Sequence, residues 1–240
     1  MKLLFVIILI FCAESLCAQS PIHITFDGDE VGKFPTGWVS RDQKNMTEVY
    51  SVQAEGGNKF LHAEANALSV QISYEKKWNI RDYPILRWRW RAVIFPIGSN
   101  EQIKRGNDSV LGVYVVFSGL PFVKAIKYIW SDTLPIGAAF DSPYSSGTKI
   151  IVMRSGRALA GTWVVEERNV FSDYEHFFGT GEKHLMAQGI AILTDSDNTN
   201  SCTIGDYAGI SISPSKEHVQ SKIKEEEINK VLDEAQRTKF

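Results

Sequence analysis

The chain has 240 residues, with 28 acidic and 26 basic side chains and a formal net charge of −2. This balance excludes the basic excess that marks a nucleic-acid-binding protein. Hydrophobic residues make up 44% of the chain and aromatic residues 11%, which is enough to build a well-packed core.

The first 18 residues have the pattern of a secretory signal peptide. Lys2 precedes an apolar run over residues 3–12, and small residues lie near a cut after Ala18. The run is about ten residues long, too short to span a bilayer. The residues before Cys17 are not the apolar and small ones that precede a lipidated cysteine. We therefore predict an exported protein of the bacterial periplasm or exterior, with no lipid anchor and no membrane span.

Short β-type segments, separated by turns rich in Gly, Asn and Asp, fill residues 19–214. The expected strands are residues 22–26, 60–65, 69–74, 86–95, 108–117, 149–153, 161–165, 189–194 and 210–213. No long helices alternate with them. The pattern predicts an all-β fold, a β-sandwich of jelly-roll type in one domain. Cys202 is the only cysteine outside the signal, so no internal disulfide is expected.

Two helical segments are expected. Ser172 and Glu175 have the spacing of a capping box, and Gly179 would end this short internal helix. Residues 215–240 are rich in Lys and Glu and lack Gly and Pro. They predict a charged C-terminal helix with a thin apolar stripe or a disordered tail, and this segment is a candidate contact for a protein partner.

The segment from Leu86 to Phe95 carries the strongest pattern. As a strand it places Arg87, Arg89 and Arg91 on one face, roughly 7 Å apart, and an aromatic wall on the other. The wall comprises Leu86, Trp88, Trp90, Ala92 and Ile94. Three neighbouring cations require water, internal carboxylates, or an anionic or polyhydroxylated ligand. The alternatives are a solvated outer face, paired with neighbouring strands, and a ligand-binding face.

Two polar residues, Asn107 and Asp108, lie at the start of the 108–117 strand. Asn107 and Asp108 are expected either to form a turn or to orient an arginine or a ligand hydroxyl. Tyr114 would join the arginine face if the two strands were neighbours. Aromatic residues near loops are candidate stacking platforms for sugar rings or, alternatively, core residues. They are Trp130, Tyr144, Trp163, Tyr174 and Tyr207.

Acidic residues offer two further kinds of site. Asp195, Asp197 and Asn198 are candidate calcium ligands, because the segment Asp195, Asp197, Thr199 mimics the first half of a calcium loop. The glycine and distant glutamate of an EF-hand are missing, so an Asx-type turn is the alternative. A further calcium hypothesis joins Asp27 or Asp29 to Asp206. No other cofactor is expected, since phosphate-binding loops and Cys or His metal motifs are absent.

Several of these segments together resemble one bacterial family, domain of unknown function 3047, over about residues 26–213. The matching segments are RDYPILRWRW (81–90), ND (107–108), VYVVF (113–117), SPY (142–144), IVMRSG (151–156), ERNV (167–170), DY (173–174) and GIAILTDSDNT (189–199). The resemblance implies an exported jelly-roll protein similar to carbohydrate-binding modules. It implies no catalytic residues. Gly112 stands where a basic residue is expected, and Tyr207-Ala-Gly-Ile210 replaces a Tyr-Gly-Asp-Ile type of ending.

The sequence therefore predicts non-catalytic binding of a glycan. An acidic polysaccharide is one candidate ligand. Arg87, Arg89 and Arg91 would supply hydrogen bonds and charge, with Asn107, Asp108 and Asp141 as polar contacts. Tyr114, Trp130, Tyr144 or Trp163 would stack on the sugar. One alternative is a glycoside hydrolase or polysaccharide lyase that uses two carboxylates from Asp108, Asp141, Glu166, Glu167 and Asp173. The other is a structural or assembly protein of the cell envelope.

Overall fold

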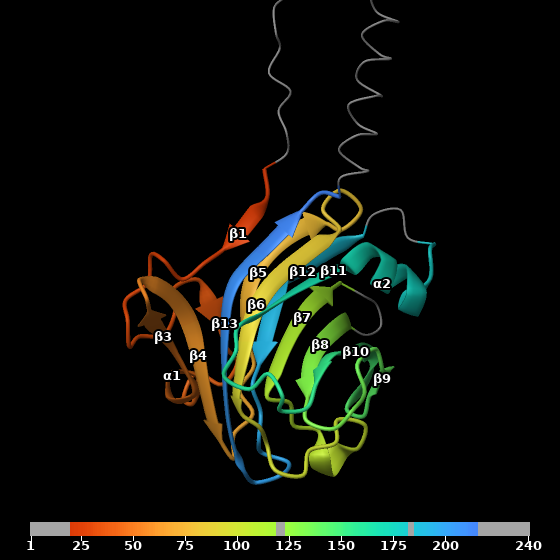
Figure 1. Cartoon of the computed structure of the whole chain (residues 1–240). Coiled ribbons are helices and arrows are strands. Elements are labelled where there is room, and N and C mark those ends of the chain that lie inside the picture. The colour runs from red at the N-terminus through yellow and green to blue at the C-terminus, as the bar shows by residue number, and fades with distance from the viewer. Residues whose placement is uncertain (1–19, 119–122, 182–184, 216–240) are drawn as a thin grey trace, which may run out of the picture.

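The computed structural model describes residues 20–118, 123–181 and 185–215. The predicted signal peptide (1–18) and, beyond Ser215, the predicted C-terminal helix or tail lie outside these residues. The described chain folds into two packed β-sheets with three short helices (Figure 1). None of the described helices is both long enough and apolar enough to cross a membrane.

Sheet A has the strand order β11-β6-β13-β4-β3, and β1 pairs with β13. Its strands are β1 (Ile22–Ile24), β3 (Tyr50–Glu55), β4 (Asn58–Asn66), β6 (Ile85–Ile94), β11 (Val164–Asn169) and β13 (Cys202–Ser213). Sheet B has the order β2-β5-β12-β7-β8-β10-β9. Its strands are β2 (Trp38–Val39), β5 (Ile72–Asn79), β7 (Leu111–Phe117), β8 (Lys124–Ser131), β9 (Ala139–Ser142), β10 (Ser145–Ser155) and β12 (Met186–Leu193).

The chain passes repeatedly from one sheet to the other. Strands β4, β5, β6 and β7 alternate between the two sheets, and so do β11, β12 and β13. All strand pairs are antiparallel except β8 with β10, which is parallel. This alternation produces the predicted sandwich of jelly-roll type. Strands that are consecutive in sequence lie in opposite sheets and pack against the same core.

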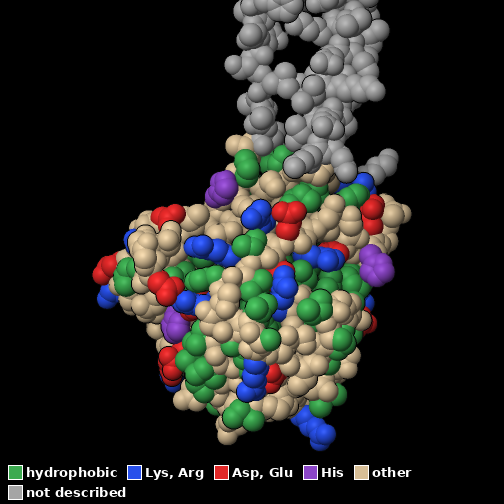
Figure 2. All heavy atoms as spheres, viewed as in Figure 1, with side chains coloured by type: hydrophobic (Ala, Val, Ile, Leu, Met, Phe, Trp, Pro, Cys, Tyr) green, Lys and Arg blue, Asp and Glu red, His purple; other side chains and the backbone are tan. Residues whose placement is uncertain are grey.

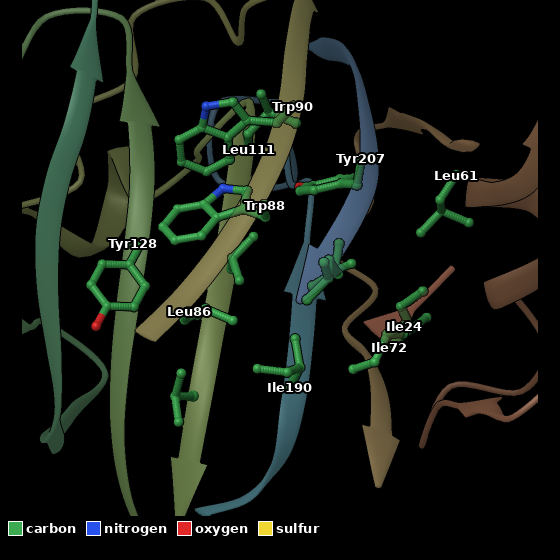
Figure 3. Packing of buried hydrophobic residues seen from close by; sticks show 14 of the residues in the cluster. Ile24, Leu61, Ile72, Leu86, Trp88, Trp90, Leu111, Tyr128, Ile190 and Tyr207 are labelled. Atoms are coloured by element: carbon green, nitrogen blue, oxygen red, sulfur yellow. The ribbon is translucent and has the colours of Figure 1, made fainter. Parts of the chain in front are cut away.

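The alternation of β6 builds the centre of the core. Leu86, Trp88, Trp90 and Ala92 are at most 1% exposed, and Trp88 packs against Tyr128 of sheet B with ring centroids 5.4 Å apart (Figure 3). Burial of aromatic and aliphatic surface of this kind dominates the stability of a sandwich. The predicted aromatic wall is therefore confirmed over most of its length.

Ile94 departs from that wall. It is 44% exposed, because the register between β6 and β13 shifts at Ile204 and Gly205, where β6 reaches the end of the sheet. Such an irregularity turns a side chain away from the face that strict alternation would give it.

The internal helix α2 (Val170–Phe178) begins earlier than its sequence predicts. Asn169, not Ser172, is the N-cap, and its side-chain oxygen accepts a hydrogen bond from the Ser172 N–H at 3.0 Å. The helix ends at Gly179, whose φ of 87° suits glycine. The other helices are α1 (Met46–Val49) and the 3-10 turn η1 (Lys104–Gly106).

Candidate functional site

The predicted arginine row lies on the outer face of sheet A, and Arg91, its last member in sequence, is neutralised by carboxylates of the protein itself. Its Nε lies 2.7 Å from Asp206 Oδ2 on β13, and its Nη1 lies 2.9 Å from Glu55 Oε2 on β3. The Arg91 side chain is 17% exposed and that of Asp206 is 2% exposed. Arg91 is therefore part of an internal ion-pair network.

The other two arginines have different surroundings. The Arg89 guanidinium lies over the half-buried Trp163 ring, 5.2 Å from its centroid, while Arg91 lies 4.8 Å from the same centroid. Arg87 is 57% exposed and lies 3.9 Å from a Glu167 oxygen. The face seen in Figure 2 shows Lys and Arg side chains scattered among acidic and hydrophobic ones rather than gathered in one basic patch.

His62 completes the network around Asp206. Its Nδ1 lies 2.7 Å from Asp206 Oδ1, so both oxygens of this carboxylate are engaged, one by His62 and the other by Arg91. Asp29 Oδ1 accepts a hydrogen bond from the Thr36 N–H. Asp206 thus has no free carboxylate oxygen for the calcium site considered with Asp27 or Asp29.

A hollow of about 350 Å³ on sheet B gathers most of the remaining predicted residues. We call it the face hollow. It is lined by Asn107, Tyr114, Tyr144, Asp195, Asp197 and Asn198, with hydroxyls of Ser142, Ser145 and Thr148 at its margin. Tyr114 belongs to β7 of sheet B, so it does not join the arginine face. Because β6 and β7 are in opposite sheets, their outward side chains lie on opposite sides of the sandwich.

The chain just after β12 explains why two aspartates meet in the face hollow. Thr194 Oγ1 donates a hydrogen bond to the Val110 carbonyl, and Ser196 Oγ donates to the Ala65 carbonyl, so both are held in the interior. In extended chain, alternate residues point to opposite sides. Asp195 and Asp197 therefore point away from the core, toward the face hollow.

Asp108 fixes the loop that carries Asp197. One of its oxygens accepts a hydrogen bond from the Asn198 N–H at 3.2 Å. The other accepts from the N–H and the hydroxyl of Thr199, at 2.7 and 2.6 Å. The buried Asp108 is thus a structural side chain that holds residues 197–199 in place.

Lys127, which the sequence patterns did not single out, forms the floor beneath Tyr114 and Asp195. It is 2% exposed, its Nζ donates to Ser109 Oγ at 3.2 Å, and it lies 5.3 Å from the Tyr114 ring centroid. A Cβ on Gly112 would lie 2.8 Å from Lys127 Cε. The cation expected at position 112 is absent, and the side chain of Lys127 from the neighbouring strand fills the space beside this glycine.

Burial shifts the ionisation of this floor. Desolvation, reinforced by Asp108 and Asp197, raises the pKa of Asp195 to about 7, against the opposing effects of Lys127 and the Ser109 N–H. Burial by itself would lower the pKa of Lys127, but the nearby Tyr114 and Asp195 outweigh it and hold that pKa above its usual range. Asp195 therefore titrates near neutral pH while Lys127 stays charged.

Asp108, Asp195 and Asp197 each offer one oxygen, and these oxygens lie within 4.8 Å of one another. Oxygen donors of this kind are the ligands that calcium prefers. However, both Asp108 oxygens hold the loop, and the Lys127 ammonium lies beside Asp195. The donor set therefore fits calcium poorly, and a metal at Asp195, Asp197 and Asn198 stays a prediction.

Other predicted residues lie elsewhere. Trp130 is 1% exposed and its Nε1 donates to the Gly156 carbonyl, so it cannot act as an exposed stacking platform. Tyr174 and Tyr207 are also buried. Asp141 is exposed, pairs with Lys149 at 2.6 Å and does not line the face hollow.

The carboxylates considered for catalysis on and beside β11 are engaged with arginines. Glu166 accepts bonds from Arg154 at 2.6 and 3.2 Å, and Asp173 pairs with Arg168. Asp173 also accepts from the Tyr128 hydroxyl. Bidentate pairs of this kind fix arginine geometry and leave little accepting capacity for a ligand.

Comparison with known families gives one match, which covers most of the chain. The model of the family described as "Protein of unknown function (DUF3047)" matches residues 36–211. The chain belongs to this family. None of the curated proteins matches it. The resemblance that the sequence motifs predict is thus confirmed, and the family description assigns no function.

Some solved structures are distantly similar. One is TmCBM61 in complex with β-1,4-galactotriose, at 8% identity and a TM-score of 0.35, covering 80% of this chain and 99% of that one. Another is the endoglucanase Cel12A from Rhodothermus marinus, at 12% identity and a TM-score of 0.37, covering 74% and 97%. A third is the CBM28 module specific for non-crystalline cellulose, at 9% identity and a TM-score of 0.36, covering 75% and 89%. Likeness at this level assigns neither ligand nor activity.

Proposed function

We propose that this DUF3047 protein binds a saccharide in the face hollow without cleaving it. The observation that carries the proposal is the convergence of an exposed aromatic ring with amide, carboxyl and hydroxyl groups. The Tyr144 side chain is 58% exposed, and Asn107, Asp195, Asp197 and Asn198 surround the same hollow. A tyrosine ring accepts the C–H face of a sugar, while short polar side chains bond its hydroxyls.

Tyr144 is held in position before any ligand arrives. Its hydroxyl lies 3.1 Å from the Lys104 carbonyl oxygen and 2.5 Å from Asn198 Oδ1, and the Lys104 ammonium lies 5.7 Å from the ring centroid. A preorganised ring loses less conformational freedom on binding than a mobile one. This favours Tyr144 as the anchor of the site.

Isothermal calorimetry with a panel of neutral and acidic oligosaccharides tests the proposal. Tyr144→Ala should weaken binding about tenfold, since aromatic packing contributes on the order of 1 kcal/mol beyond buried area. The matched control is Trp163→Ala, which removes an aromatic ring from the arginine face on the other side of the sandwich and should leave the affinity unchanged. The reverse pattern would move the ligand to the arginine face and reject the face hollow.

Glycoside hydrolysis in the same hollow is the second candidate, favoured by one observation. Asp195, with its raised pKa near 7, and Asp197 have oxygens within 4.8 Å of each other. Glycosidases flank the scissile bond with two carboxyl groups roughly 5 to 10 Å apart. Asp195 and Asp197, however, are only two residues apart on one loop, which favours binding over cleavage, because a glycosidase places its two carboxyl groups on either side of the scissile bond. Release of reducing ends, abolished in Asp195→Asn, would establish the hydrolase instead.

We also propose that the protein acts outside the cytoplasm, a proposal supported by the signal-peptide pattern of residues 1–18. Cell fractionation with an antibody against the folded domain tests it. Finding the full-length chain only in the cytoplasm would reject export.

A further inference from the structure

A second hollow adjoins the face hollow at the end of the sandwich. We call it the rim hollow; its volume is about 580 Å³, and its lining includes Ser99, Ile103, Arg105 and Thr199. The larger size and mixed lining of this second hollow distinguish it from a packing defect, since gaps inside protein cores are rarely larger than a water molecule.

The two hollows are adjacent, because residues that are neighbours in sequence line one hollow and the other. Gly106 lines the rim hollow and Asn107 the face hollow, while Asn198 lines the face hollow and Thr199 the rim hollow. The Tyr144 hydroxyl lies between the two chain segments, in contact with Lys104 and Asn198. A ligand that stacks on Tyr144 therefore lies next to the rim hollow.

Ser99 contributes a hydroxyl group, unpaired within the described part of the chain, to the lining of the rim hollow. It is 4% exposed, it lines the hollow, and its Oγ has no hydrogen-bond partner among the described residues. Nearby in sequence, the fully buried Glu101 uses Oε2 to accept from Ser131 at 2.8 Å, while its Oε1 has no such partner. Buried polar atoms are almost always paired, so an unpaired hydroxyl at a hollow indicates a partner from outside the chain.

We infer that the ligand is an oligosaccharide extended over both hollows, with a sugar hydroxyl bonded to Ser99 in the rim hollow. This inference rests on the proposed saccharide binding in the face hollow. The lining is suited to a sugar ring, because the Ile97 and Ile103 side chains, 75% and 41% exposed, can cover its C–H surface. The exposed Arg105 guanidinium offers donors to its hydroxyls.

A length series tests the inference. Cello- and galacto-oligosaccharides of two to six units are titrated into the full chain and its Ser99→Ala variant by calorimetry. Affinity should rise with length, and Ser99→Ala should weaken the longest ligand about two- to tenfold, the effect of one neutral hydrogen bond, while the disaccharide is unaffected. Ser211→Ala, on the outer face of sheet A, is the matched control and should change nothing.

Two results would overturn the inference while leaving the proposed function in place. One is equal affinity for saccharides of all lengths, while Tyr144→Ala still weakens binding about tenfold. The other is unchanged affinity of Ser99→Ala at every length, which would mean that only water bonds this hydroxyl. Failure of every saccharide to bind would reject the proposed function and this inference together. Thermal unfolding of Ser99→Ala should match the parent chain, so that a loss of affinity reports on the hollow.

Discussion

The outer faces of the two sheets treat polar side chains in opposite ways. On sheet A, Arg91 is held by Asp206 and Glu55, and Arg89 packs on Trp163. On sheet B, Asp195 and Asp197 point into a hollow, and the exposed Tyr144 lies beside them. The arginines of β6 thus find their partners within the protein, while the polar groups of the face hollow on sheet B keep hydrogen-bonding capacity for a ligand.

This difference shows that a row of like charges needs compensating partners, but that these partners need not be a ligand. On sheet A, other strands supply the partners, because β3 and β13 bring carboxylates within 3 Å of Arg91. On sheet B a loop held by Asp108 directs its polar groups outward. The following substitutions test whether the two faces differ as described, in order of decreasing effect.

Removal of Asp206 should have the largest effect on stability. Asp206→Ala removes the buried carboxylate partner of the mostly buried Arg91 and leaves it the exposed Glu55, and breaking a buried ion pair costs roughly 3 to 5 kcal/mol. Urea denaturation measures the change in free energy of unfolding. Glu64→Ala, which removes an exposed carboxylate 4.0 Å from His62, serves as the control and should have little effect. A loss below about 1 kcal/mol in Asp206→Ala would contradict a self-satisfied network on sheet A.

Crowding around Lys127 should give the next effect. In Gly112→Ala the new Cβ would lie 2.8 Å from Lys127 Cε and 3.1 Å from the Leu193 carbonyl oxygen. Overpacking of this kind destabilises a protein by roughly 1 to 3 kcal/mol. Gly28→Ala is the matched control, because no atom lies within 4 Å of its added Cβ. Equal unfolding midpoints for the two variants would show that the Lys127 side chain does not fill the space beside Gly112.

The ionisation of Asp195 predicts a dependence of stability on pH. Its pKa of about 7 in the folded protein exceeds the ordinary value of roughly 4 in the unfolded chain, so the folded state binds more protons between these values. Stability due to this group therefore falls as pH rises from about 4 to 7, by at most about 1.4 kcal/mol per pH unit, and is level above 7.

Comparison of Asp195→Asn with the parent chain at pH 5 and pH 8 measures this dependence. The variant should gain stability relative to the parent at the higher pH, because it lacks the buried ionised carboxylate. A difference between the two proteins that is the same at both pH values would mean that Asp195 is accessible to water. It would then not belong to a buried floor.

Loss of Arg87 should have the smallest effect. Its side chain is 57% exposed and lies 3.9 Å from Glu167, so Arg87→Ala should change the free energy of unfolding by less than about 0.5 kcal/mol. Its affinity for the saccharide panel should also be unchanged. Loss of binding to acidic saccharides alone in this variant would restore the arginine face as a ligand site.

Local patterns predicted the faces of the strands well. The alternation in β6 correctly placed Trp88 and Trp90 in the core and the arginines outside, because side-chain direction depends only on the extended backbone. The same patterns indicated a loop or metal site around Asp195. They missed β8, with its lysine-containing sequence, because Lys127 reads as a solvent-facing residue and only tertiary neighbours explain its burial.

Sequence by itself determined that this chain is an all-β sandwich of the DUF3047 family, and which residues of β6, apart from Ile94 at its end, face the core. Only the tertiary structure decided that Tyr114 and Arg89 lie on opposite sheets, that Trp130 is buried, and that Asp108 serves the loop rather than a ligand. The physical reason is that strand direction follows from neighbours along the chain. Strand pairing and charge compensation, in contrast, join residues that are far apart in sequence.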